Sequence, residues 1–512
     1  MKLKLLSLAL SMCLLPDLVV CADPIEKHKL IIVGAGASGI AAATKLISNG
    51  FEDFIILEAE NRIGGRVYNI PYEGNTSIDM GAQWMVGQKG NVVYEMAKEF
   101  NLAQEECPDY FNLFTSVNSS GAPMNKDHIE EVLNIWHKSS GEEEMNKYNG
   151  SLGEYARERL QSELTKNPKL SYLASTPAFD QIMDFLGKAQ NSLDASDSWF
   201  ETSAKRYNSF VTHEGCEDTV WKKGGYGNVL KLLLKQMPGQ TPIDLGKKLL
   251  LNKEVTKINW EDANGVLVTC ADGSQYSADK VLITVSLGVF KSDLITFVPP
   301  LPPQKKNIIE SLFLGTVDKV FVRFPQKWWP DDVRGYNFFW THDDEKNPLF
   351  KDTAVVDGAP WIVDLYGFYL TTEDPLTFLG WISGASARFM ETLSDEQIKT
   401  ESMKAFRFFL GANYTIPEPS RVFHSSWGTN KHFKGSYSIY TLTTDKMNAS
   451  RHDLEAPLSN GQGKQVLLFA GEASNEHQYG TVNGAVETGW READRILKSD
   501  PAPSLNAVPR VG

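Results

Sequence analysis

The sequence predicts an α/β fold in which a parallel-sheet domain is interleaved with an α+β domain. Near the start of the chain, a glycine-rich turn joins an apolar run to a small-residue helix in "IIVGAGASGIAAATKL" (31–46). Near the end, a second apolar strand and small-residue helix occupy 466–497. The chain has 512 residues, which is too many for one ordinary core, and 42% of them are hydrophobic.

The first element is a βαβ unit, with strands at 29–33 and 54–57 around a helix at 37–48. Its first turn reads Gly34-x-Gly36-x-x-Gly39, where the glycines allow a tight turn, the approach of a pyrophosphate and close helix–strand packing. The helix N-terminus adds free N–H groups and a partial positive charge. The candidate contacts of a Rossmann-type dinucleotide site are Gly34, Gly36, Ala37, Ser38 and Gly39.

Glu58 ends the second strand about twenty residues further on, where a carboxylate accepts hydrogen bonds from ribose hydroxyls. The alternative is an ordinary glycine-rich turn with a surface acid. The next segment, "EAENRIGGRVY", contains Gly64, Gly65 and Arg66. A bare Gly-Gly pair lets the backbone approach a phosphate, and a guanidinium neutralises it.

With this motif, the sequence resembles the FAD-dependent amine oxidase family and, within it, the animal polyamine oxidases. The resemblance implies non-covalently bound FAD and extends from Lys29 to about Leu497. Four further segments resemble flavin-domain motifs: 79–91, 222–233, 251–260 and 278–291. By resemblance, they and the last block, 467–497, place these residues at the cofactor: Gly81, Ala82, Gln83, Trp84, Val255, Gly471, Glu472, Thr481 and Val482.

The last block also predicts secondary structure independently of the resemblance. It predicts a buried strand at 466–470 and a helix at 482–497, with Ala485, Gly489 and Ala493 forming a small-residue stripe for another backbone. The alternative for Glu472 is an acid that caps a loop.

Because dinucleotide elements occur at both ends of the chain, we expect discontinuous domains. The FAD-binding domain comprises 26–85, 224–296 and 460–498, and the substrate-binding domain comprises 86–223 and 297–459.

"LGTVDKVFVRFP" (314–325) predicts a strand with Lys319 among apolar residues. Burying a lysine is costly unless it has a task or a partner. The resemblance implies a catalytic lysine that is hydrogen-bonded through water to flavin N5. The alternative is a strand lysine whose amine reaches solvent.

Candidate substrate contacts also follow from the resemblance. "SSWGTNKHFKGSYSIY" (425–440) places Trp427 near the flavin and Tyr437 in the substrate channel, unless both are core residues. Thr481 matches the small hydroxylated residue of animal members. Val86 replaces a Glu or His that holds a substrate nitrogen, and Asn483 replaces a common histidine. Glu201 is a candidate second anchor, against a solvated helix acid.

The resemblance implies oxidation of a polyamine, namely spermine, spermidine or an acetylated form. Hydride transfer to FAD gives an imine, which hydrolyses to an aldehyde and a shorter amine, while O2 gives hydrogen peroxide. Two alternatives stay open: an L-amino-acid or other amine oxidase, and a secreted flavin-binding protein with reduced or lost catalysis. A covalent monoamine oxidase is disfavoured because no cysteine follows Cys270.

The composition and the two ends of the sequence give further expectations about partners and localisation. With 51 basic and 64 acidic side chains, the net charge of −13 argues against general nucleic-acid binding. Residues 1–21 read as a signal peptide rather than a membrane anchor, and 499–512 as a disordered tail. A mature chain would retain Cys107, Cys216 and Cys270, enough for one disulfide and one free thiol. We therefore expect a secreted protein without stable membrane insertion, glycosylated at Asn75, Asn118, Asn149, Asn413 and Asn448.

Overall fold

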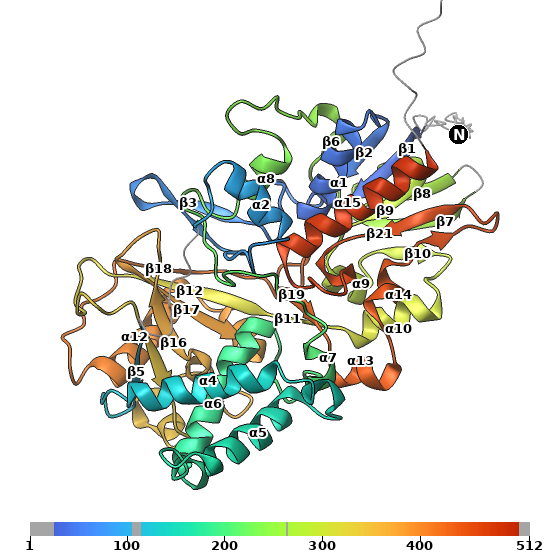
Figure 1. The fold of residues 1–512 in the computed structure, drawn as a ribbon. Coiled ribbons are helices and arrows are strands. Elements are labelled where there is room, and N and C mark those ends of the chain that lie inside the picture. The colour runs from blue at the N-terminus through green and yellow to red at the C-terminus, as the bar shows by residue number, and fades with distance from the viewer. Residues whose placement is uncertain (1–24, 105–113, 263–264, 501–512) are drawn as a thin grey trace, which may run out of the picture.

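The computed structural model describes residues 25–104, 114–262 and 265–500, which build two large β-sheets flanked by helices, together with three two-stranded sheets (Figure 1). The strands of the first sheet are β1 (Glu26–Val33), β2 (Phe54–Leu57), β6 (Leu249–Leu250), β7 (Val255–Asp262), β8 (Gly265–Cys270), β9 (Gln275–Ile283), β10 (Thr296–Val298), β20 (Leu458–Ser459) and β21 (Gln465–Phe469). Their main order is β10-β7-β8-β9-β1-β2-β6, and β21 joins through β9 with β20 beside it.

Strand β9 brings distant parts of the chain together in this sheet. It pairs in parallel with β1, while its first half pairs with β8 and its last residues, 281–283, pair with β21. Residues 30–33 of β1 are almost fully buried, as expected for a parallel strand covered on both faces. The ends of β1 and β21 therefore flank the end of β9.

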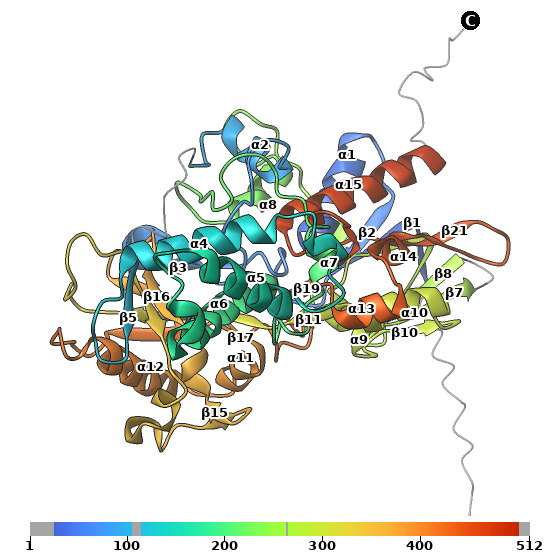
Figure 2. The ribbon, with the colours of Figure 1, turned by 60° about the horizontal axis from the view of Figure 1, so that its bottom comes forward.

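The predicted βαβ unit is present. Helix α1 (Ala37–Ser48) and β2 have the predicted bounds, whereas β1 begins three residues early because 26–28 pair with β9. Helix α15 (Val482–Ser499) packs directly on α1, and both are visible side by side in Figures 1 and 2. A Cβ on Gly489 would lie 2.2 Å from the Ser38 carbonyl oxygen, so this crossing requires a glycine.

The second sheet has the strand order β18-β12-β17-β16-β13-β5. The strands are β5 (Phe114–Asn118), β12 (Val317–Arg323), β13 (Gly335–Phe339), β16 (Gly367–Leu370), β17 (Thr377–Ser383) and β18 (Arg421–His424). Helices α4 (Lys126–Ser140), α5 (Leu152–Lys166) and α6 (Pro177–Asp194) lie on one side, and α11 (Gly384–Met390) and α12 (Asp395–Leu410) on the other (Figure 2). Neighbouring residues of β13 show this arrangement, because Phe338 packs towards α12 and Phe339 towards α6.

Shorter elements surround and join the sheets. They are β3 (Asn69–Tyr72), β4 (Thr76–Asp79), α2 (Val92–Glu99), α7 (Ala204–Tyr207), α8 (Asn228–Leu233), α9 (Leu287–Lys291), α10 (Pro303–Ser311), β11 (Phe313–Gly315), β14 (Val355–Val356), β15 (Ala359–Pro360), β19 (Tyr437–Ile439), α13 (Leu442–Met447) and α14 (Arg451–Glu455). Strands β11 and β19 form a two-stranded ladder.

Some of these elements pack differently from the predicted division of the chain. Ile308 of α10 and Leu454 of α14 share a core with the first sheet, although 297–459 was assigned to the substrate domain. Val93 of α2, within 86–223, likewise packs with α1. The apolar faces of these helices cover the first sheet, and the domain boundaries stay a prediction.

Two further features bear on the expectations. Cys216 is disulfide-bonded, and Cys270 is a buried free thiol. Over the described ranges, no helix combines the length and apolarity that crossing a bilayer requires. The predicted signal peptide, the tail from 501 onwards and Cys107 lie outside those ranges.

Candidate active site

A cavity of about 750 Å³ lies against both sheets. It is lined by almost every residue that the sequence singled out, from segments far apart in the chain: Gly34, Gly36, Ala37, Ser38, Glu58, Gly65, Arg66, Gly81, Ala82, Gln83, Trp84, Val86, Val255, Lys319, Trp427, Tyr437, Gly471, Glu472, Thr481 and Val482. Gly39 and Glu201 are not among its lining residues. The roles of the lining residues stay predictions, but the fold brings them to one space.

The glycine turn has three different tasks. Gly34 has φ +104°, a backbone conformation that favours glycine. A Cβ on Gly36 would meet nothing within 4 Å, so the space above it is open to a ligand. A Cβ on Gly39 would lie 2.0 Å from the Gly34 carbonyl oxygen. Gly39 therefore serves close packing of α1 on the turn.

Glu58 ends β2 at the cavity wall and is held by the backbone. Its Oε2 accepts a hydrogen bond from Ala35 N at 2.6 Å, and its Oε1 accepts one from Glu60 N at 2.8 Å. Burial raises the pKa of Glu58, although these two N–H donors favour its charged form. The carboxylate is thus fixed beside the glycine turn.

Arg66 and Glu472 form an ion pair that joins the start of the chain to its end. Arg66 Nη1 lies 3.0 Å from Glu472 Oε1 and also donates to the Ser436 carbonyl at 2.5 Å. Glu472 Oε2 accepts from Ser438 Oγ at 2.7 Å and from Gly480 N at 2.9 Å. Burial opposes ionisation of Glu472, but the guanidinium charges and these donors hold its pKa below its usual range.

A second arginine, which the sequence analysis missed, stands behind Glu472. Arg451 is fully buried, and its Nη1 donates to Ser438 Oγ at 2.8 Å and to the Ala473 carbonyl at 2.9 Å. Its guanidinium lies 4.6 Å from the Tyr440 ring centroid and 4.0 Å from that of Tyr479. Because Ser438 accepts from Arg451, its hydroxyl proton is directed at Glu472.

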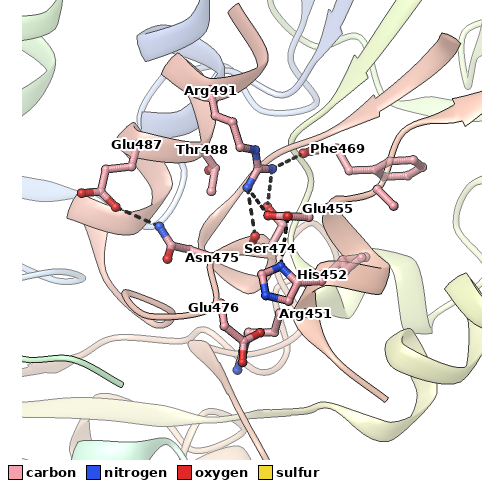
Figure 3. A network of polar contacts seen from close by, with 12 residues as sticks. Arg451, His452, Glu455, Phe469, Ser474, Asn475, Glu476, Glu487, Thr488 and Arg491 are labelled. Carbon is pink, nitrogen blue, oxygen red and sulfur yellow. Dashed lines mark hydrogen bonds and ion pairs between the residues drawn. The ribbon is translucent and has the colours of Figure 1, made fainter. Parts of the chain in front are cut away.

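Arg491 of α15 anchors the same region (Figure 3). It donates to the carbonyl oxygens of Phe469 at 2.9 Å and Ser474 at 3.2 Å, and it pairs with Glu455 of α14 at 2.7 Å. This arginine fixes α14, α15 and the short helix η8 (Glu472–Ser474) to the end of β21. The short helix that carries Glu472 is therefore held through Arg491 to α14, to α15 and to the end of β21.

Lys319 of β12 is buried and points at the segment after β4. Its Nζ donates to the carbonyl oxygens of Asp79 at 2.7 Å and Gly81 at 2.8 Å, and to Gln83 Oε1 at 2.8 Å. It also lies 4.8 Å from the Trp381 ring centroid. A solvent-reaching amine is thereby excluded, because the side chain is 2% exposed.

Lys319 and Asp79 are both buried, and the charge of each affects the pKa of the other. Burial lowers the pKa of Lys319, and the charge of Asp79 opposes this change. Burial likewise raises the pKa of Asp79, whose carboxylate accepts from Tyr226 N. A lysine with a lowered pKa can exchange a proton near neutral pH, which suits a group at a reaction centre.

Aromatic side chains form much of the remaining wall. Trp427 is buried and donates from Nε1 to the Met80 carbonyl at 3.1 Å. Trp84 and Trp381 lie with their ring centroids 5.3 Å apart. Tyr437 donates to the Ser192 carbonyl at 2.5 Å, and burial raises the pKa of its hydroxyl.

Val86 and Asn483, the two residues that differ from the family pattern, occupy different places in the structure. Val86 lines the cavity, so an apolar side chain stands where relatives are expected to carry a polar anchor. Asn483 is buried outside the lining, and its Oδ1 accepts from Val92 N at 2.8 Å. Asn483 therefore supports the start of α2, while neighbouring Thr481 caps α15 by accepting from Gly484 N.

Glu201 is exposed, and the structure does not bring it into the site. Another acid, Asp194 at the end of α6, lines the cavity instead. It accepts from Gln190 Nε2 at 2.8 Å, and burial within the cavity wall raises its pKa to about 7. No local pattern marks Asp194, because only the packing of α6 turns it inwards.

Comparison with known proteins identifies the family. The flavin containing amine oxidoreductase family matches residues 37–497. The chain belongs to this family. The protein is a FAD-dependent amine oxidase.

Individual relatives agree with this assignment. The amine oxidase is 28% identical over 510 residues to the peroxisomal N(1)-acetyl-spermine/spermidine oxidase of Bos taurus, covering 92% of this chain and 94% of that protein. It is 28% identical to polyamine oxidase 1 of Zea mays, covering 96% and 94%. A putrescine oxidase structure with bound putrescine shares its fold with a TM-score of 0.66 at 20% identity, covering 93% of this chain and all of the other.

The cavity of this amine oxidase fits FAD. The space above Gly36 is open at the N-terminus of α1, where a diphosphate is favoured, and Glu58 is fixed nearby for a ribose. The Arg66–Glu472 pair and the Val255 backbone stand on the same wall.

Proposed function

We propose that this amine oxidase is a polyamine oxidase that acts on spermine, spermidine or their acetylated forms. The observation that carries the proposal is Asp194, an acid facing the same cavity as Lys319 among aromatic walls. A flexible polycation needs a carboxylate for a distant ammonium and apolar faces for its methylenes. The named relatives include enzymes of polyamine oxidation.

In this proposal, the chain's own groups set the protonation of the substrate. Only a neutral amine releases hydride readily, so the aromatic wall around Trp427 and Tyr437 favours the deprotonated reacting nitrogen. Asp194 holds a distant ammonium, which takes over part of the anchoring that Val86 lacks. Lys319 holds the segment 79–83, which lines the reaction centre, with all three of its N–H donors. FAD, when bound, would supply the hydride acceptor and the electrons that convert O2 to hydrogen peroxide.

Asp194→Asn tests the substrate class. The anionic form binds the ammonium, so the KM of the wild type for spermine falls as the pH rises through about 7. The variant should raise KM at pH 8 by roughly tenfold or more, about 1.4 kcal/mol, and lose this pH dependence. Glu201→Gln is the matched control, because that acid is exposed. An unchanged KM in Asp194→Asn contradicts the proposed anchor.

Anaerobic mixing with a panel of amines distinguishes the alternatives. Bleaching of the flavin by polyamines supports the proposal, bleaching by L-amino acids alone supports an amino-acid oxidase, and a flavin that stays yellow supports lost catalysis. Among the described lining residues, Arg66 is the only arginine, and it is paired with Glu472. A free guanidinium for a substrate carboxylate is therefore missing from that part of the wall.

We also propose that the enzyme is secreted and glycosylated. The disulfide at Cys216 suits an oxidising compartment. Asn149, Asn413 and Asn448 are exposed, so these sequons are accessible to modification. Treatment of protein from culture medium with an endoglycosidase should lower its mass, and a protein retained inside the cells contradicts the proposal.

A further inference from the structure

A buried carboxyl group lies behind the loop that carries Trp427. Asp318 of β12 is fully buried and precedes Lys319, so the two side chains point to opposite faces of the sheet. Its Oδ1 accepts from Ser425 Oγ at 2.7 Å and from Trp427 N at 3.3 Å. Its Oδ2 is buried without a hydrogen-bond donor. Such an orphan oxygen is costly unless it carries a proton itself.

A second carboxyl group converges on the same loop. Glu391, at the end of α11, accepts from Gly428 N at 2.6 Å and from Thr429 N at 2.5 Å. Asp318 lies within hydrogen-bonding reach of Glu391. Two carboxyl groups thus receive the three consecutive N–H groups of residues 427–429.

The charged side chains nearby make their hydrogen bonds to other groups, although the charge of Arg388 also acts on Glu391. Lys319 bonds the 79–83 segment, and Arg388 of α11 makes bonds of 2.9 and 2.7 Å to Asp197. His424 of β18 contacts the Ser425 carbonyl and faces Asp395 at 3.7 Å. Burial and the adjacent Glu391 raise the pKa of Asp318 well above its usual range. Two ionised carboxylates in this place would repel each other.

We propose that Asp318 is protonated in the folded enzyme and donates from Oδ2 to Glu391, and that this carboxyl pair positions the Trp427 loop against the cavity. One proton is shared by two carboxyl groups, and Glu391 carries the negative charge because it receives two N–H donors. Asp318 is a positioning residue, since it acts on the cavity through Trp427.

The pair has a signature in the pH dependence of stability. In the unfolded chain, Asp318 ionises near pH 4, so folding takes up one proton above this pH. Stability from this group is therefore lost as the pH rises from about 4 towards the raised folded pKa. Over that window, the group increases the unfolding equilibrium constant tenfold per pH unit.

Asp318→Asn is the decisive variant. Its amide can donate to Glu391 and accept from Ser425, so the geometry survives without the proton. We expect the ratio of the unfolding constants, wild type over variant, to rise about tenfold per pH unit between pH 5 and 8. Hydrogen exchange of residues 427–429, corrected for intrinsic rates, should lose protection at alkaline pH in the wild type but not in the variant.

Asp374→Asn is the matched control, because Asp374 is also buried beside this sheet but is paired with Arg323 at 2.8 Å. Asp374→Asn should lower stability, but the ratio of the unfolding constants, wild type over this variant, should not rise with pH. If Asp318→Asn behaves like this control, Asp318 is ionised and the proposal fails. If the ratio rises but exchange at 427–429 does not differ, the pair does not position the loop.

A second variant covers the case in which Asp318→Asn does not fold. Glu391→Gln supplies an amide that can donate to ionised Asp318. It should therefore also remove the tenfold rise of the unfolding equilibrium constant per pH unit. A slope that persists in Glu391→Gln overturns the shared proton. These measurements use the purified holoenzyme without amine, so they are independent of the proposed polyamine substrate.

Discussion

Lys319 donates three hydrogen bonds to the segment from Asp79 to Gln83, and the Trp381 ring lies beside its ammonium group. A buried ammonium bound in this way fixes the backbone that lines the cavity. Burial also lowers its pKa, although the charge of Asp79 opposes this change. Both effects depend on the charge and the length of one side chain.

Lys319→Met should retain bound FAD but slow flavin reduction or reoxidation by at least roughly tenfold, about 1.4 kcal/mol of barrier. Stopped-flow absorbance measures both half-reactions. Lys305→Met is the control, because Lys305 is equally buried but bonds the carbonyls of Leu454 and Ala456 outside the cavity. It should lower stability without changing these rates, and unchanged rates in Lys319→Met would remove that lysine from the mechanism.

Gly36→Val should give a folded but colourless protein. The added side chain meets open space in the turn but fills the room of the pyrophosphate. Gly39→Ala is the contrasting variant, because its Cβ would strike the Gly34 carbonyl and destabilise the turn itself. Circular dichroism and flavin absorbance separate the two results. Normal flavin content in Gly36→Val would contradict the assigned phosphate position.

Site residues that belong to a local sequence motif could be predicted. Site residues whose position depends on packing between distant segments could not. Gly34, Gly36 and Glu58 follow from spacing within one βαβ unit and line the cavity, whereas Gly39 of the same motif packs α1 on the turn. Asp194 and Arg451 carry no such pattern, since their burial depends on elements far away in the chain. Glu201 was predicted because family members carry an acidic residue in this region, but the sequence does not show that its side chain is exposed and that Asp194 lines the cavity.

The crossing of α1 and α15 links elements from opposite ends of the chain. Gly489 meets Ser38, and Gly471 N donates to Thr488 Oγ1 at 2.9 Å, so the α15 register also sets the loop before Glu472. The stripe of Ala485, Gly489 and Ala493 predicted such a crossing, but only the fold identifies α1 as the partner.

Gly489→Val should push α15 away from α1 and lower both stability and flavin affinity. Overpacking usually costs about 1–3 kcal/mol, and contact with a rigid carbonyl places this variant at the upper end. Urea unfolding and flavin titration measure the two effects. Gly461→Ala, at a site with open space around its Cβ, is the control and should change stability by less than about 0.5 kcal/mol.

At the scale of the whole molecule, the cavity touches both sheets, so its ligand stabilises them together. Removal of FAD should lower the melting temperature, and added FAD at about 100 times its Kd should restore roughly 2.7 kcal/mol. Differential scanning calorimetry of the stripped and reloaded protein checks this expectation. Gly36→Val should show no response to added FAD, and an equal shift in that variant would indicate binding elsewhere.

The position of β21 beside β9 has a consequence for biosynthesis. A ribosome must deliver the strands of both large sheets before β21, η8 and α15 emerge and can dock. The wall at 471–482 is consequently translated after the other cavity segments, and until then a nascent chain displays the glycine turn without its counterpart. Loading of the coenzyme is therefore expected to follow the synthesis of α15.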